Sequence, residues 1–162
     1  MPDVFSILSD DHRRVERLFS QFEQGADPQV AQQICDELTI HATVEEELIY
    51  PLLASKAGYQ GLAMEAREEH DEAKQLIEQI DAGVAAGEDV SSLVQQLKES
   101  VSHHVEEEEN DIFPKMKDKL PTIAPMLGDD VLSRKETLEA QVKEARSLGM
   151  PSRVVGAKPV AG

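Results

Sequence analysis

Four stretches of the sequence repeat apolar residues at steps of three and four, and short breaks separate them. The breaks lie at residues 25–29, 57–61 and 86–92, and each contains residues that stop or start helices. Steps of three and four place side chains on one face of an α-helix, which is the face that packs into a bundle. No stretch alternates apolar and polar residues in the manner of a strand. The pattern predicts an all-α fold built around four packed helices.

The pattern changes after Leu120, where Pro121 and Pro125 interrupt it. Residues 130–148 are predicted to be helical again, and the chain end at 151–162 to form a flexible tail. We therefore divide the chain into a four-helix unit, residues 1–120, and a C-terminal extension, residues 121–162. The C-terminal extension could serve in sensing or in association with another protein, and the chain could form a homo-oligomer.

Composition and charge restrict the function classes. The chain has 162 residues, 40% of them apolar and 30% charged, which suits one soluble globular domain. The net charge of −16 counts against binding to nucleic acid or to an anionic membrane, because both need basic patches. No apolar run is long enough for a membrane span, and the N-terminus does not resemble an export signal. The single cysteine, Cys35, favours a cytoplasmic location.

Six polar residues interrupt the apolar faces of the four helices. They comprise four histidines and two glutamates, His12, His41, Glu45, His70, His104 and Glu108. The fifth histidine, His103, lies about 100° around the helix from His104 and off the apolar face. A single buried histidine is most often a hydrogen-bonded core residue. Six inward polar residues on four helices are harder to explain, because burying an unpaired carboxylate costs several kcal/mol at least.

A metal centre accounts for the whole set. Two similar cassettes, HATVEEELIYP at 41–51 and HVEEEENDIFP at 104–114, each place a histidine and a glutamate four residues apart, so that both side chains project in the same direction. His12 and His70 would complete the site from the other two helices. Imidazoles and carboxylates suit two closely spaced first-row transition ions, and iron is the best candidate. Zinc is the lesser option, because no HExxH motif is present.

The order of these residues, with the EE pairs and the Tyr-Pro and Phe-Pro endings, resembles the hemerythrin-like HHE cation-binding family over about residues 1–120. The resemblance implies an up-down-up-down four-helix bundle, to which the C-terminal segment adds a further helix. It also implies two iron ions, oxo- or hydroxo-bridged. In that reading Glu45 and Glu108 bridge the irons, His12 and His41 bind one iron, and His70 and His104 bind the other.

The chain departs from the oxygen-carrying hemerythrins in its second cassette. That group has five histidine ligands and a second cassette of the form HxxxH followed by an aspartate. Here Glu108 occupies the second cassette, and the ligand set of four histidines and two glutamates is symmetric. Because reversible oxygen carriage depends on an asymmetric open position, it is not the expected role.

The residues around the cassettes carry weaker expectations. Five glutamates are expected on the solvated helix surface, namely Glu46, Glu47, Glu106, Glu107 and Glu109. Of these, Glu109 could substitute as a ligand if the helix is distorted. Asp111 is either an outer partner that orients a histidine or an exposed residue at a helix end. On an ideal helix Tyr50 and Phe113 fall roughly opposite the ligands, although the prolines that follow them should bend the helix.

Three functions from different classes remain, and the least specific of them is a metal-free helical interaction module with histidines in its core. The leading expectation is a di-iron protein that binds or reacts with a small oxidant, namely oxygen, peroxide or nitric oxide. Catalase-like peroxide removal and redox sensing both fall within it. The alternative is iron storage or an iron-dependent stability switch. Ferritin-like oxidase sites use Glu-xx-His motifs, which the paired helices lack.

Overall fold

The computed structural model describes residues 3–152 and is all-α in this range. Two π-helical segments, η1 and η2, interrupt otherwise α-helical rods. The elements are α1 (Val4–Gly25), α2 (Pro28–Val44), η1 (Glu45–Ile49), α3 (Tyr50–Ser55), α4 (Gln60–Ala85), α5 (Ser91–Glu107), η2 (Glu108–Ile112), α6 (Phe113–Lys119) and α7 (Ile123–Ser147). None of these helices is long and apolar enough to cross a membrane.

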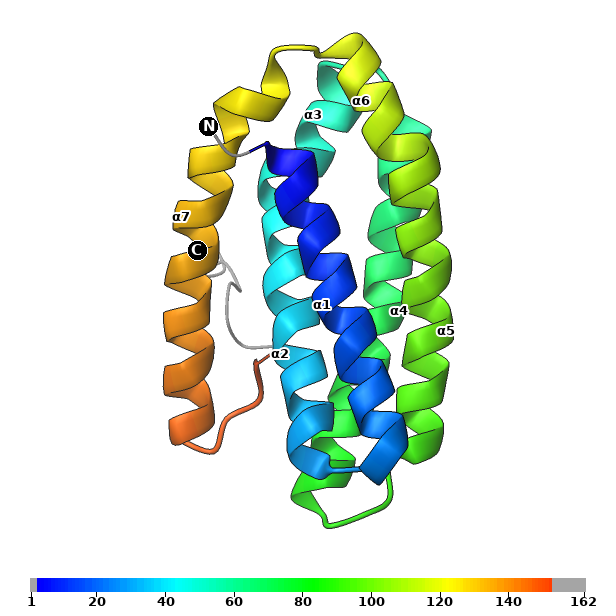
Figure 1. Cartoon of the computed structure of the whole chain (residues 1–162), viewed down its shortest axis with the longest axis vertical. Helices are drawn as coiled ribbons and strands as arrows, with labels where there is room; N and C mark the ends of the chain where they lie inside the picture. The colour runs from blue at the N-terminus through cyan, green and yellow to red at the C-terminus, as the bar shows by residue number, and fades with distance from the viewer. Residues whose placement is uncertain (1–2, 153–162) are drawn as a thin grey trace, which may run out of the picture.

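Four rods run side by side in an up-down-up-down bundle, and α7 lies outside the bundle (Figure 1). The first and third rods are α1 and α4. The second combines α2, η1 and α3, and the fourth combines α5, η2 and α6. The fifth helix, α7, packs against α1 and α2. The predicted all-α bundle with an additional C-terminal helix is therefore confirmed.

Local signals at the first break explain why the chain turns there. The helix α1 ends at Gly25, and Ala26 adopts the left-handed conformation, with φ of 50°. Asp27 then caps α2, because its side chain accepts a hydrogen bond from the backbone N–H of Gln29 at 2.9 Å. Pro28 occupies the first turn of α2, where its missing N–H has no helical partner to lose.

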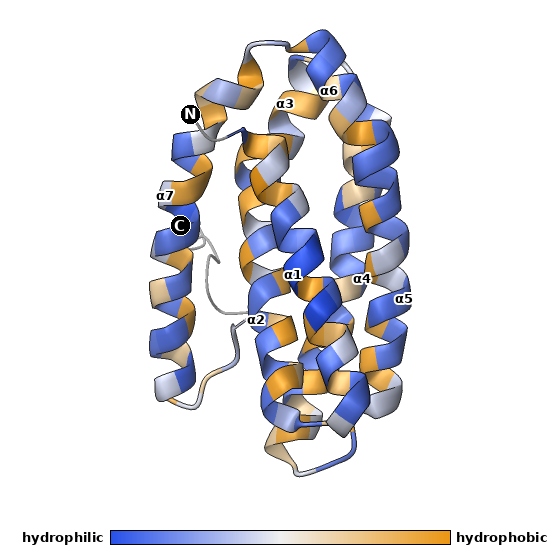
Figure 2. Ribbon diagram, in the orientation of Figure 1, coloured by the Kyte–Doolittle hydropathy of each residue, from blue (hydrophilic) through white to orange (hydrophobic). Residues whose placement is uncertain are grey.

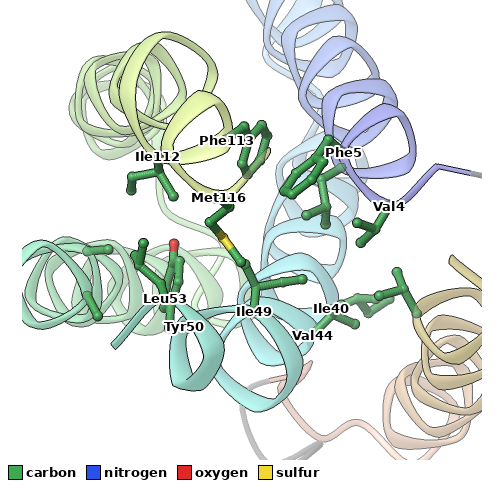
Figure 3. Close-up of a cluster of buried hydrophobic side chains, with 14 of the residues drawn as sticks. Val4, Phe5, Ile40, Val44, Ile49, Tyr50, Leu53, Ile112, Phe113 and Met116 are labelled. Carbon is green, nitrogen blue, oxygen red and sulfur yellow. The ribbon is translucent and has the colours of Figure 1, made fainter. Parts of the chain in front are cut away.

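The apolar core is divided into two clusters. One cluster, built around Phe5, Val44, Tyr50 and Met116, fills the end of the bundle that carries α3 and α6 (Figure 3). The other is built from the opposite ends of the four rods and includes Val15, Phe19, Phe22, Val30, Ala31, Ile34, Cys35, Ile77, Ile80, Val90, Val94 and Leu97. The exposed faces of the rods are largely hydrophilic (Figure 2). A polar layer lies between the two apolar clusters, and it contains the six predicted site residues.

The helix α7 begins at Ile123, seven residues before the predicted start at residue 130. Pro125 is compatible with this start because it lies in the first turn, where backbone N–H groups have no partner within the helix. Val131, Leu138 and Val142 of α7 belong to the first apolar cluster. The extension thus shares a core with the bundle, whereas most of the predicted flexible tail, from residue 153 onward, lies outside the described residues.

The π segments shift the helical phase within both cassettes. The backbone N–H of Tyr50 bonds to the carbonyl of Glu45, and that of Phe113 bonds to the carbonyl of Glu108, five residues earlier in each case. Pro51 and Pro114 follow directly, where a regular α-helix would bring the proline ring against the carbonyl four residues earlier. Each π segment absorbs one extra residue, so the side chains beyond it rotate by about 100° relative to an α-helix.

This rotation corrects the predicted apolar face of the second rod. The three-and-four pattern predicted Leu48 and Leu52 as inward residues, but both are only partly buried. Ile49 and Leu53, one position later in each case, are fully buried instead. The pattern therefore holds up to Glu45 and is wrong by one residue after it.

Candidate metal centre

All six predicted site residues meet in the polar layer at the middle of the bundle, and all are buried. Glu45 and Glu108 have no solvent exposure. The side chains form two groups with the spacing of metal-binding clusters. One group contains His12, His41, Glu45 and Glu108, and the other contains Glu45, His70 and His104.

The two groups are the two halves of one centre. In the first half, the Nε2 atoms of His12 and His41 lie 3.2 Å apart. In the second half, the Nε2 atoms of His70 and His104 lie 3.1 Å apart. Each half thus takes one histidine from each of two consecutive rods, and the four Nε2 atoms face inward.

Both glutamates lie between the halves. Glu45 Oε1 is 3.1 Å from His41 Nε2 and 3.3 Å from His70 Nε2. Glu108 directs one oxygen to each half, with Oε1 at 3.1 Å from His12 Nε2 and Oε2 at 3.5 Å from His104 Nε2. This is the position that a carboxylate shared by two ions requires.

The donor set fits a metal. Imidazole nitrogens and carboxylate oxygens are the ligands that first-row transition ions take in proteins. Glu45 Oε2 is buried without a hydrogen-bond partner among the described residues, which is costly for a carboxylate oxygen unless a cation satisfies it. The family resemblance and this cluster together support metal binding, and neither identifies the ion or the number of ions.

A third kind of side chain joins the histidines and glutamates of the centre, namely the phenol of Tyr50. Its hydroxyl donates to Glu108 Oε2 at 2.8 Å and to Glu45 Oε1 at 3.2 Å. The same oxygen lies 3.0 Å from the Nε2 atoms of both His70 and His104. Tyr50 does not take the position opposite the site residues that an ideal helix would give it, because the η1 segment before Pro51 turns the residue inward.

The equivalent residue in the other half, Phe113, carries no donor atom. Its ring stacks parallel to that of His12, with the centroids 6.1 Å apart and an interplanar angle of 3°. It also packs against Phe5, at a centroid distance of 5.1 Å (Figure 3). The arrangement of four histidines and two glutamates is symmetric, and the contacts of Tyr50 with one half make the cluster asymmetric.

Each of the four histidines places its outer nitrogen, Nδ1, against a carboxylate. The pairs are His12 with Glu109 at 2.9 Å, His41 with Asp11 at 3.1 Å, His70 with Glu46 at 3.2 Å and His104 with Glu69 at 2.9 Å. A carboxylate that accepts the Nδ1 proton fixes the tautomer in which Nε2 is free to bind a metal, and it orients the ring.

These contacts correct several expectations for the acidic neighbours. Glu46 and Glu109, expected on the solvated surface, each contact a histidine of the centre. Asp111 does not contact a histidine among the described residues and instead forms an ion pair with Lys115. The expectation of a surface position is met by Glu106, which is exposed.

Two of the outer partners, Asp11 and Glu69, were missed in the sequence, although a signal exists for all four. Asp11 and Glu69 directly precede His12 and His70, and each holds the histidine of the following rod. The other two partners directly follow the shared glutamates in the EE pairs. The side chain next to a ligand on one rod therefore supports a ligand on a neighbouring rod.

Electrostatics in the layer favour charged pairs when no metal is bound. Burial alone would lower the pKa of His41, but attraction to Glu45 and hydrogen bonds to Asp11 and Glu108 raise that pKa well above its usual value. Burial would likewise lower the pKa of His104, whereas Glu108 raises it well above the usual value. Burial and repulsion from Glu108 would raise the pKa of Glu45, but His41 lowers it to about 2.

These shifts predict opposite pH responses for the metal-free and metal-bound protein. A raised histidine pKa stabilises the metal-free fold fully below the unfolded value of 6.5, and the stabilisation is lost as the pH rises through the folded value. The lowered pKa of Glu45 also stabilises the metal-free fold, and this stabilisation is fully present above pH 4.5 and is lost as the pH falls. Urea unfolding of metal-free protein should therefore show maximal stability at mildly acidic pH, between about 4.5 and 6.5.

Metal affinity should rise over the pH range in which metal-free stability falls, because the ion must displace the protons from the histidines. Titration of Co²⁺ at a series of pH values would measure this. A metal-free protein that becomes more stable from about pH 6.5 upward would contradict the assigned ion pairs.

A cavity of about 630 Å³ reaches the histidine side of the centre. Its lining comes from α1, α2, η1, α4 and α5, and it includes all four histidines of the centre. Apolar side chains such as Val15, Ile77 and Val101 also line it. The volume lies in the range of small-molecule binding sites. Small molecules therefore have room to approach the centre from the side of the histidines.

Comparisons with known proteins place this geometry in a family. A curated protein of Nostoc sp. (strain PCC 7120 / SAG 25.82 / UTEX 2576), named DNA nickase, is 35% identical over 122 residues, which make up 73% of this chain but 34% of the relative. No solved structure gave a match. A family model described as "Hemerythrin HHE cation binding domain" matches residues 3–116, the part that holds all six buried donors. The chain belongs to this hemerythrin HHE family.

Proposed function

We propose that this protein is a non-haem di-iron protein that binds or reacts with a small oxidant, namely oxygen, peroxide or nitric oxide. The observation that carries the proposal is the convergence of four inward Nε2 atoms and two shared carboxylates in one buried layer. Iron fits this mixed nitrogen and oxygen donor set. We also propose that the protein is located in the cytosol, because its single cysteine suits a reducing compartment.

In this proposal the two halves of the centre bind one iron each. His12 and His41 hold one ion, His70 and His104 hold the other, and Glu45 and Glu108 are shared. The shared position is supported by the short distances from each glutamate to histidines of both halves. When bound, oxo- or hydroxo-bridged iron would supply Lewis acidity and one-electron redox chemistry. The chain orients the donors, buries them and keeps the Nδ1 protons on the carboxylate side.

The activity in the name of the Nostoc relative is that protein's own. The match covers only 34% of the relative's length. A net charge of −16 also opposes contact with a phosphate backbone. A small molecule is the more suitable ligand, because the cavity leads directly to the histidines.

Metal analysis tests the proposal. Protein from iron-supplemented cells should contain about two iron ions per chain and show near-ultraviolet charge-transfer absorption. Zinc obtained after ordinary expression would be less decisive, since zinc outcompetes ferrous iron at such ligands. A colourless protein with about one zinc ion per chain, even after iron-rich expression, would rule out a di-iron centre. Turnover of added peroxide would then separate a peroxide-consuming enzyme from a sensor that changes only its spectrum.

Tyr50 is proposed as an additional ligand in the half that contains His70 and His104. Its hydroxyl lies 3.0 Å from both Nε2 atoms, and its burial with Glu108 and Glu45 raises the pKa of the phenol well above its usual value in the metal-free protein. Without a metal the phenol keeps its proton and donates it in a hydrogen bond to Glu108, and a bound cation would take the place of that proton.

The Tyr50→Phe variant should therefore lose visible phenolate-to-iron absorption while retaining most of its iron, because the four histidines and two glutamates remain. Absorption spectra and iron content of the same samples would measure this. Tyr59→Phe is the matched control, since Tyr59 is the other tyrosine of the chain and packs in the apolar cluster beside α3. If iron-loaded wild type and Tyr50→Phe have the same visible spectrum, Tyr50 is not a ligand.

A further inference from the structure

Each carboxylate that supports a histidine of the centre is itself paired with a basic side chain. The pairs are Glu109 with Arg13 of α1, Glu46 with Lys74 of α4, Glu69 with His103 of α5, and Asp11 with Lys135 of α7. Three of these basic residues belong to the bundle. Lys135 alone among them comes from α7, which lies beyond the residues that match the family, 3–116.

Burial distinguishes the Lys135 pair from the other three. The side chains of Arg13, Lys74 and His103 are 46%, 45% and 66% exposed, whereas that of Lys135 is 12% exposed and that of Asp11 is 6% exposed. Exposed ion pairs contribute little because water screens them. Loss of Lys135 would leave the buried Asp11 with His41 as its remaining partner, so Asp11 depends on Lys135 more than the other carboxylates depend on their exposed partners.

Other contacts hold α7 in the position that this pair needs. Arg134 donates two hydrogen bonds to the carboxylate of Glu47, at 2.8 and 3.0 Å, and Glu47 lies in η1 two residues after Glu45. Near the C-terminal end of α7, Arg146 donates a hydrogen bond to the carboxylate of Asp36 in α2 at 2.8 Å. The helix therefore contacts both the outer partner of His41 and the π segment that carries a shared glutamate.

We propose that α7 is a coupled part of the metal centre, in which Lys135 acts as a positioning residue. Through Asp11, Lys135 holds the His41 imidazole so that Nε2 faces the half formed with His12. This inference rests on the proposed metal centre, because it assigns α7 to one half of that centre. Docking of α7 strengthens metal binding in that half, and by thermodynamic reciprocity metal binding strengthens the docking of α7 by the same factor.

Anaerobic titration with Co²⁺, followed by its visible absorption, tests the first part of the coupling. Changes to outer partners of metal-binding histidines reduce metal affinity about 10- to 100-fold. Because Asp11 itself remains, Lys135→Met should reduce the affinity for the ion bound by His12 and His41 by only about tenfold. The other ion, bound by His70 and His104, should keep its affinity. Lys135→Arg should restore the affinity for the ion bound by His12 and His41. Lys143→Met is the matched control, because Lys143 is exposed on the same helix.

Hydrogen exchange of α7 tests the reciprocal part, first in the wild-type protein and then in Lys135→Met. Saturation of the wild-type protein with Co²⁺ should slow exchange around Val131 and Leu138 by about the same tenfold factor, and Lys135→Met should lose this protection. Unchanged α7 exchange in wild type, or equal weakening of both ions in Lys135→Met, would overturn the inference and leave the metal centre in place. A wild-type chain that binds no Co²⁺ would overturn the metal centre itself and this inference with it.

Discussion

Replacement of Glu45 or Glu108 by glutamine should reduce iron to well below about one ion per chain and suppress any reactivity with peroxide. Each carboxylate contacts histidines of both halves, so either substitution should disturb both ions together. Glutamine also removes a negative charge that offsets the repulsion between two cations in a buried layer. Iron content, measured on protein purified from iron-supplemented cells, would check this expectation.

The control for these variants is Glu106→Gln, because Glu106 is exposed on the same rod as Glu108. Glu46 is not a suitable control, since it supports the Nδ1 atom of His70. A Glu45→Gln protein that keeps about one tightly bound iron ion would show that the glutamates are terminal ligands of separate ions.

Replacement of His104 by alanine should remove iron and lower the thermal unfolding temperature together. A metal that binds only the folded state stabilises it by about 2.7 kcal/mol when the free ion is about 100-fold above Kd. For a chain of this size, the loss corresponds to roughly 5–10 °C. Calorimetry of the iron-loaded proteins would measure the shift, and His41→Ala should behave in the same way.

The neighbouring histidine provides the matched control. The side chain of His103 is 66% exposed and contacts Glu69 at 3.6 Å, outside the layer of ligands. His103→Ala should therefore retain iron and differ little in unfolding temperature. The opposite result, iron lost from His103→Ala and kept by His104→Ala, would mean that the assigned phase of α5 is wrong.

The sequence predicted the parts of this molecule that follow a regular helical period. The apolar steps of three and four located the rods, and the six polar residues that interrupt them meet in one layer. The prediction was correct for His12 and His70 because each lies on an uninterrupted α-helix. On such a helix, residues at steps of three and four stay on the same face, so the histidine faces inward together with the apolar residues before and after it. Their placement required no knowledge of how the rods pack.

Prediction failed where the backbone leaves the α-helical period. A one-residue shift after Glu45 buried Ile49 and Leu53, and it brought Tyr50 into the centre. Pro51 and Pro114 indicated that the helices are disturbed there. However, a proline can be accommodated either by a bend or by a π segment, and the spacing of the apolar residues does not show which of the two forms. Asp11 and Glu69 were missed for another reason, since each acts across the gap between two rods.

The π segments also have a consequence for how such a centre changes over evolutionary time. Each one accommodates a single additional residue between Glu45 and Pro51, or between Glu108 and Pro114, without displacing the histidines that precede it. Loss of that residue would restore a continuous α-helix and place the aromatic residue four positions after the glutamate, about 40° around the helix from it and still facing the centre. Conversion of the segment to an α-helix without such a loss would instead rotate Tyr50 by about 100° and carry its hydroxyl away from the centre. A one-codon deletion in this stretch is thus compatible with an unchanged arrangement of the histidines, the glutamates and the Tyr50 hydroxyl.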